Sequence, residues 1–268
     1  PKASRLLRNQ PSAEPRPSLK RSIYKVLDDL SPSISYPLDG VAPILIGSGI
    51  EQCLTVSSHS LLYEGDIVSP AITYSVEVSD AEGEVRGRLK RRVEKGKSWR
   101  ADLTGMFPAH VRASDTLSIG LMKVKWRFDS PGKRGTARPQ IEINARAGSC
   151  AVHTQRAGNA LEKRVTLLWQ PADQRLFLSI VNPARNRLEG RIEYPVVDGE
   201  DEFGAVQSQN FSVAANGATL QEIVLSGEAA HLLVGQPIEV RAEMSDPGYK
   251  MHVLCASPDL GRFSIDHL

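Results

Sequence analysis

The sequence is poor in the residues that mark disulfide-rich, metal-binding and membrane-spanning proteins. Its 268 residues include three cysteines, Cys53, Cys150 and Cys255, an odd number without a CxxC spacing. This pattern speaks against a disulfide framework or a zinc site. No apolar run reaches about 18 residues, so we expect no transmembrane segment. The first residues lack the basic, apolar and small-residue order of a secretory signal, and we expect an intracellular, cytoplasmic protein unless a leader has been removed.

The usual motifs of enzymes are also absent. The chain contains no GxSxG nucleophile turn, no GxxxxGK[ST] phosphate loop and no GxGxxG dinucleotide fingerprint. No HxH or HExxH spacing occurs among the six histidines, which are His59, His110, His153, His231, His252 and His267. We therefore expect no metal site, no cofactor and no enzymatic activity. Carboxylates brought together from distant strands would leave no signal in one sequence, so an active site of that kind stays an alternative.

The clearest acidic cluster is the stretch Asp198–Glu202, which carries four carboxylates in five residues. Calcium sites in loops usually follow a DxDxDG pattern, and this stretch does not match it. We interpret it as a solvated hairpin turn, with calcium binding as the alternative.

Aromatic residues make up only 6% of the chain, and helical periodicity is nearly missing after Tyr36. Short apolar segments are instead separated by Gly, Pro, Ser and Asp. In Ala71–Val78, the residues Ile72, Tyr74 and Val76 alternate with polar ones, as expected of an antiparallel strand with one buried side. Such segments are Ala42–Ile46, Gln52–Val56, Ile67–Val68, Ala71–Val78, Val85–Leu89, Ser98–Leu103, Thr116–Phe128, Gln140–Ala145, Val165–Trp169, Leu176–Val181, Leu188–Tyr194, Gln209–Val213, Thr219–Leu225, Ile238–Met244, Met251–Cys255 and Phe263–Ile265.

These patterns predict an all-β protein with two tandem antiparallel β-sandwich domains, preceded by a flexible basic arm and one short helix. Residues 1–37 form the proline-rich arm, with a helix over Leu19–Leu30 that packs on its own chain or on a neighbouring subunit. The first sandwich spans 38–158 and the second 159–268, because periodicity lapses over Gly148–Leu161.

The two halves also resemble each other. Tyr74–Glu84 parallels Gly190–Glu200, and Val93–Phe107 parallels Val213–Gly227. A short helical connector follows in both halves, and a further strand comes after it. Few residues are identical, so the pattern predicts either a repeat or the general likeness of any two sandwiches.

Charge is spread unevenly, although the net charge is only +2. Residues 1–37 carry 7 basic and 3 acidic side chains, residues 38–158 carry 17 and 13, and residues 159–268 carry 9 and 15, which gives +4, +4 and −6. Two basic strips lie in the first sandwich, and their candidate anion-binding residues are Arg86, Arg88, Lys90, Arg91, Arg92, Lys95, Lys97, Lys123, Lys125, Arg127, Lys133, Arg134 and Arg138. If both strips share one surface, they would bind a polyanion in a salt-dependent way. The alternative is that they only solvate the sheet and protect its edges.

From these features we expect a structural or assembly protein that forms a homo-oligomer and binds nucleic acid or an acidic membrane surface, as a coat or matrix protein does. That expectation rests on fold-level analogy. A carbohydrate-binding or adhesion module is the alternative.

Overall fold

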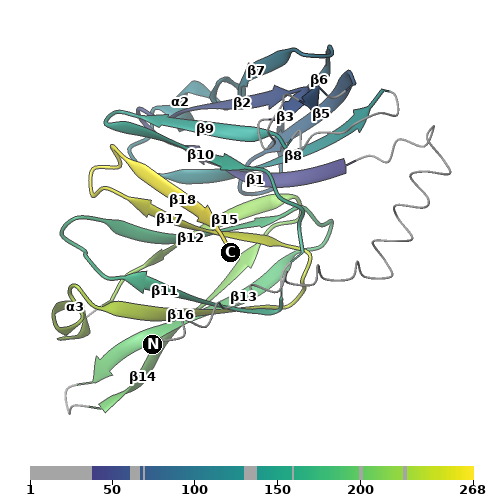
Figure 1. Ribbon diagram of the computed structural model, residues 1–268. Coiled ribbons are helices and arrows are strands. Elements are labelled where there is room, and N and C mark those ends of the chain that lie inside the picture. The colour runs from purple at the N-terminus through teal and green to yellow at the C-terminus, as the bar shows by residue number, and fades with distance from the viewer. Residues whose placement is uncertain are drawn as a thin grey trace, which may run out of the picture.

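The computed structural model describes residues 38–60, 67–68, 70–129, 138–158, 160–198, 202–225 and 228–268, so the predicted arm and helix of residues 1–37 lie outside it. The chain is nearly all β, and every strand pair is antiparallel. Four four-stranded sheets lie one beside another in Figure 1. The predicted all-β fold is confirmed.

The first half forms two facing sheets. Sheet A has the order β1-β8-β5-β6 and sheet B the order β10-β9-β2-β7. A small hairpin, a 3-10 turn and helix α2 connect them. The elements are β1 (Leu38–Ile46), β2 (Glu51–Ser57), β3 (His59–Ser60), β4 (Ile67–Val68), β5 (Ile72–Ser79), β6 (Val85–Val93), β7 (Ser98–Asp102), η1 (Thr104–Met106), α2 (Ala109–Arg112), β8 (Ser118–Phe128), β9 (Gln140–Ala145) and β10 (Gly148–His153). Apolar residues of both sheets share one buried cluster that includes Ile44, Leu54, Val76 and Ile141.

The second half repeats this plan. Sheet D has the order β11-β16-β13-β14 and sheet E the order β15-β12-β17-β18. The elements are β11 (Glu162–Leu168), β12 (Arg175–Asn182), β13 (Leu188–Asp198), β14 (Glu202–Val213), β15 (Gly217–Ile223), α3 (Glu228–Leu232), β16 (Pro237–Met244), β17 (Lys250–Ala256) and β18 (Phe263–His267). Its core cluster includes Leu178, Ile180, Ile192 and Val240.

Strand order shows that the two halves are equivalent. Matching β1 with β11, β5 with β13, β6 with β14 and β8 with β16 turns sheet A into sheet D, and the remaining strands turn sheet B into sheet E. Helices α2 and α3 occupy the same place in each half. This agreement favours a repeat over a general likeness.

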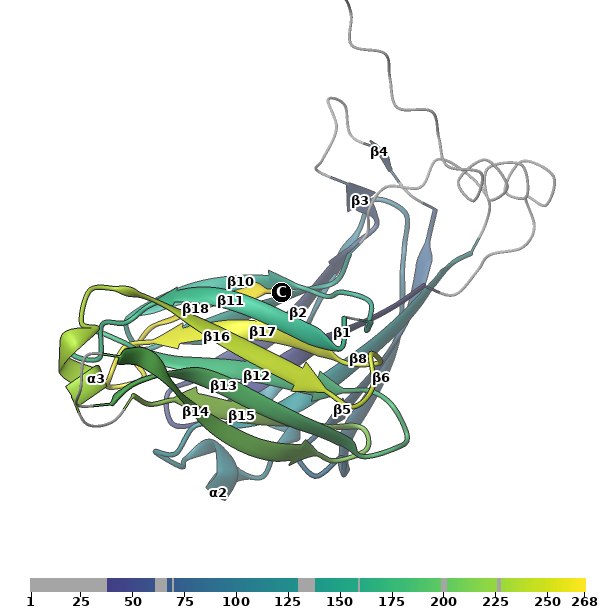
Figure 2. The same cartoon turned by 90° about the horizontal axis from the view of Figure 1, so that it is seen from below.

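The two central strands of sheet E, β12 and β17, are buried on both faces. In β12, Leu178 and Ile180 point into the second core, whereas Phe177 and the neighbouring β17 residue Leu254 belong to the cluster of the first core. Strands β12 and β15 contact β8, β12 also contacts β1, and β18 contacts β10. The two sandwiches therefore pack through an apolar interface. Figures 1 and 2 show the ribbons of sheet E lying against the first half.

The segment Gly148–His153 was not among the predicted strands, yet it forms β10. This strand lies at a sheet edge, with Val152 buried and Ser149 and Ala151 exposed, so the small residues show little alternation. The domain limits at 158 and 159 stay a prediction. Within the described residues, no helix is long and apolar enough to cross a bilayer.

Candidate anion-binding groove

The two predicted basic strips lie on the same face of sheet A. Strand β5 is paired with β6 on one side and with β8 on the other. Ser75 is opposite both Lys90 and Lys125, and the same register places Glu77 between Arg88 and Lys123 and Thr73 between Arg92 and Arg127. Since alternate residues of a strand share a face, three rows of paired cations cross the outer side of this sheet.

Four of these cations line a groove of about 760 Å³ between the two sandwiches. Its floor comes from sheet A, and one wall comes from turns of the second sandwich. The lining residues include Asp39, Ser75, Glu77, Arg88, Lys90, Lys123, Lys125, Pro183, Ala184, Arg185, Asn216 and Gly248. Five of them are basic and two are acidic, so the groove carries a net positive charge.

The acidic centre of the groove is Glu77. Its carboxylate lies 2.6 Å from the Lys123 Nζ and 2.9 Å from the Arg88 Nε. Hydrogen bonding from Lys123, followed by that from Arg88, holds the pKa of Glu77 below its usual value, although partial burial acts in the opposite direction. Glu77 is therefore ionised at neutral pH and fixes the two cations beside it.

The row next to Glu77 has no acid between its cations. Lys90 and Lys125 are exposed on either side of Ser75, and neither forms an ion pair with any residue that the structure describes. The carboxylate of Asp39, opposite Lys125, lies 3.1 Å from the Arg156 Nε. Arg185 on the facing wall is exposed as well. These three side chains are available to an anionic ligand.

Asn216 connects the floor to the wall. Its backbone adopts φ 56°, which Asn tolerates better than most residues do. The Asn216 Oδ1 accepts a hydrogen bond from the Lys123 Nζ at 2.9 Å, and its carbonyl accepts one from the Ser79 Oγ at 2.6 Å. This residue therefore links the second sandwich to the cationic face of the first.

Not all of the predicted basic residues reach the groove. Arg86 lies beside a β-bulge and pairs with Asp80 at 2.5 Å and Glu84 at 2.7 Å, and Arg92 pairs with Asp129 and Glu94. Lys95 and Lys97 lie in the exposed turn after β6, and Arg91, Arg127 and Arg138 are exposed outside the groove. Lys133 and Arg134 are outside the described residues.

The wall residues Arg185 and Asn216 were missed at the level of sequence. Arg185 follows β12 and Asn216 follows β14, both in the second half of the chain, and no local pattern connects them with the basic strips. The repeat does not supply this connection, because it makes β14 equivalent to β6 and does not determine how the two halves pack on each other.

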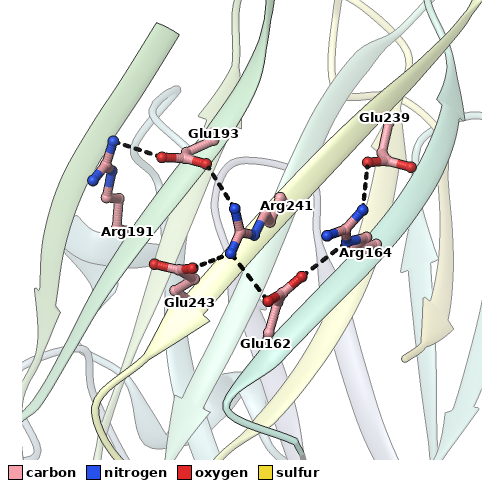
Figure 3. Close-up of polar contacts among 7 residues, drawn as sticks. All are labelled: Glu162, Arg164, Arg191, Glu193, Glu239, Arg241 and Glu243. Atoms are coloured by element: carbon pink, nitrogen blue, oxygen red, sulfur yellow. Dashed lines mark hydrogen bonds and ion pairs between the residues drawn. The ribbon is translucent and has the colours of Figure 1, made fainter. Parts of the chain in front are cut away.

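The equivalent face of sheet D has a different charge pattern, shown in Figure 3. Arg241 takes the place of Lys123 and pairs with Glu162, Glu193 and Glu243, while Arg164 and Arg191 pair with the same group of acids. By register, the row of Lys90, Ser75 and Lys125 corresponds to Asn210, Arg191 and Glu243. The surplus of positive charge is thus specific to the first sandwich.

Of the two acidic turns, the one around Asp80 lies within the described residues, and it gives no sign of a metal site. Asp80 is nearly buried, accepts a hydrogen bond from the Glu84 backbone N–H at 2.9 Å and pairs with Arg86. Residues 199–201 of the Asp198–Glu202 stretch lie outside the described residues. Elsewhere in the described ranges, no three His, Cys, Asp or Glu side chains are grouped so that they could hold a metal ion.

Comparison with known proteins gives no family. No family model matches the chain, and no curated protein matches it. Among solved structures, it is similar to a glycosyl hydrolase family 2 member from Bacteroides cellulosilyticus, with 12% identity, a TM-score of 0.22 and coverage of 85% of this chain and 27% of that one. A tandem CBM22 domain from Paenibacillus barcinonensis shows 10% identity, a TM-score of 0.23 and coverage of 87% and 82%.

A putative β-galactosidase from Bacteroides fragilis shows 10% identity and a TM-score of 0.21, with coverage of 87% of this chain and 33% of that one. The chain spans about a quarter to a third of the length of the glycoside hydrolases that it matches. Similarity at such TM-scores gives no basis for assigning a function.

Proposed function

We propose that this protein is a non-enzymatic binding protein that holds a linear polyanion, with nucleic acid as the main candidate, in the groove over sheet A. The observation that carries the proposal is the row in which Lys90 and Lys125 flank Ser75 without an acidic neighbour between them. Together with Arg185, these lysines offer three exposed cations to a ligand inside one concave surface.

The shape and lining of the groove favour a polymer that is recognised by its charge. A concave groove suits a chain better than it suits the flat surface of a bilayer. No aromatic side chain lines it among the described residues, so base stacking and the stacking of sugar rings have no platform there. Contacts to phosphate groups of the backbone need only cations and hydrogen-bond donors.

The chemistry of the groove favours binding over catalysis. Its two carboxylates, Asp39 and Glu77, are both held in ion pairs. A general acid or base works best with a pKa near the operating pH, whereas the pKa of Glu77 is lowered. Bound in this groove, a polymer would be coated or organised by the protein, as the hypothesis of a coat- or matrix-like role requires.

The experiment compares two double variants of the full chain. Lys90→Ala/Lys125→Ala removes the groove lysines, and Lys95→Ala/Lys97→Ala removes the same charge from the exposed turn beyond β6. Affinity for a fluorescent DNA duplex is measured by anisotropy between about 50 and 200 mM salt. We expect the groove variant to bind at least about tenfold more weakly. The slope of log K against log salt concentration should become shallower by about 2, since each phosphate contact contributes about 0.9.

The turn variant should change affinity by less than about twofold. An equal loss in both variants would show that binding follows overall charge and would contradict the groove. Heparin, acidic vesicles and neutral glycans serve as parallel ligands. Binding to vesicles or neutral glycans in place of DNA would replace this proposal with the membrane or carbohydrate alternative.

A further inference from the structure

Strand β14 is an open edge of sheet D. Each four-stranded sheet has two edge strands, and four of the eight, β1, β10, β15 and β18, pack on the other sandwich. The outward edges are β6, β7, β11 and β14. Strand β14 is the longest of these four, with 12 residues, and among the described residues its only strand partner is β13.

The outward edges differ in how they are protected. Exposed charged side chains commonly prevent an edge from pairing with another sheet. Five Arg or Lys residues lie in β6, while β7 contains Arg100 and Asp102, and β11 contains Glu162, Lys163 and Arg164. In contrast, residues 203–215 contain no charged side chain. Of the four outward edges, β14 is the one without this protection over most of its length.

Because the two halves repeat the same plan, β14 can be compared with β6 position by position. Register places Arg88, Lys90 and Arg92 of β6 opposite Glu77, Ser75 and Thr73 of β5. In the second half, the equivalent positions of β14 are Ser208, Asn210 and Ser212, opposite Glu193, Arg191 and Glu189 of β13. All three are exposed. The same structural edge is therefore cationic in one sandwich and neutral in the other.

We infer that β14 pairs in an antiparallel manner with β14 of a second copy of this chain and joins two D sheets into one. A two-fold axis brings a surface onto itself, so the surface must complement itself. The side chains of Gln207, Ser208, Gln209 and Asn210 each donate and accept hydrogen bonds, and they meet this condition without opposing like charges. Backbone N–H and C=O groups of the free edge supply the ladder.

The strand is also held in place before it pairs. Gly190 has no side chain, and a Cβ there would lie 2.4 Å from the Phe211 ring, so the ring packs across this glycine toward the second core. With Phe211 fixed, the flanking residues Asn210 and Ser212 are presented outward in one arrangement. The inference goes beyond polyanion binding and does not depend on the groove.

The test measures self-association of the full chain by sedimentation velocity between about 1 and 100 μM. We expect a dimer that forms with increasing concentration and is equally stable in about 50 and 500 mM salt, because neutral groups form the contact. In the variant Ser208→Lys/Asn210→Lys, lysines would face each other across the two-fold axis, and the dissociation constant of the dimer should rise at least about tenfold.

The matched control is Ser149→Lys/Ala151→Lys, which adds the same charges at exposed positions of the edge strand β10. This control should form the wild-type dimer, and in the wild type the amides of residues 207–213 should exchange hydrogen more slowly as the dimer forms. A monomer at all concentrations would overturn the inference. So would a dimer that is lost in high salt, that resists the β14 lysines, or that responds equally to the β10 lysines.

Discussion

His252 in β17 is fully buried, yet neither of its ring nitrogens has a hydrogen-bond partner among the described residues. The same holds for the Oγ of Ser179, which lies opposite His252 on the paired strand β12. Both residues point toward the first sandwich, as Leu254 does. The charged and titratable groups around the His252 ring are Lys250 on the same strand, His267 on β18 and His153 on β10. The last two rings touch, with centroids 4.8 Å apart.

Burial, reinforced by Lys250 and the two other histidines, lowers the pKa of His252 to about 3. In the unfolded chain this pKa is about 6.5. The unfolded state therefore binds the proton more readily, so this contribution to stability is complete above pH 6.5 and declines as the pH falls toward 3. At pH 5, this residue alone should lower the free energy of unfolding by about 2 kcal/mol relative to pH 7.5.

Urea unfolding at the two pH values measures this loss. His252→Leu should be less sensitive to acid by about the same amount, and the exposed His110→Leu should behave like the wild type. If both variants lose as much stability in acid as the wild type, the acid sensitivity does not come from His252.

At the scale of elements, turns hold the sandwiches together. Gly83, in the turn between β5 and β6, has φ +84°, and a Cβ there would lie 2.0 Å from the carbonyl oxygen of Ala215. The Ala218 N–H donates to the Ala81 carbonyl at 3.2 Å in the same contact. The acidic glycine turn of the first half therefore docks on the glycine turn of the second.

Gly83→Ala should cost at least about 3 kcal/mol of stability. About 1 kcal/mol comes from the left-handed backbone, and the rest comes from the displaced turn and the loss of the hydrogen bond that the Ala81 carbonyl accepts from the Ala218 N–H. Gly235→Ala is the matched control, since Gly235 has φ +75° and open space around it. Urea unfolding of both variants gives the difference, and similar losses in the two would mean that the contact with Ala215 adds nothing.

Elements with strong alternation were predictable from the sequence. Ile72, Tyr74 and Val76 mark β5, and Gln140–Ala145 is β9 with the same limits. Strand β10 was missed because it is an edge strand of small residues in which Val152 is the buried one, so its sequence shows little alternation. Alternation within β6 and within β8 predicts that the cations of each strand share a face. That β5 lies between these two strands, so that the cations face each other across it, depends on the strand order of the sheet. Arg185 and Asn216 depend on the packing of one sandwich on the other, which no local pattern encodes.

At the scale of the whole molecule, sheet E contributes to two cores at once. Leu178 faces sheet D, and Leu254 packs in the cluster that contains the first core. Both leucines are fully buried. Because separated halves would expose the interface side of sheet E, we expect the described body to unfold in one cooperative step, even though the sequence predicts two domains.

Leu254→Ala and Leu178→Ala remove the same atoms from the two faces of this sheet, and each should cost about 2–5 kcal/mol. Two single-tryptophan proteins report on the halves separately: Trp99→Phe/Trp169→Phe retains Trp126 in the first core, and Trp99→Phe/Trp126→Phe retains Trp169 in the second. In a cooperative molecule both tryptophans follow the same urea curve, and Leu178→Ala moves both curves together although the substituted side chain lies in the second core. If Leu178→Ala moved the Trp169 curve alone, the halves would unfold separately, and the interface through Leu254 would be a contact between two independent domains.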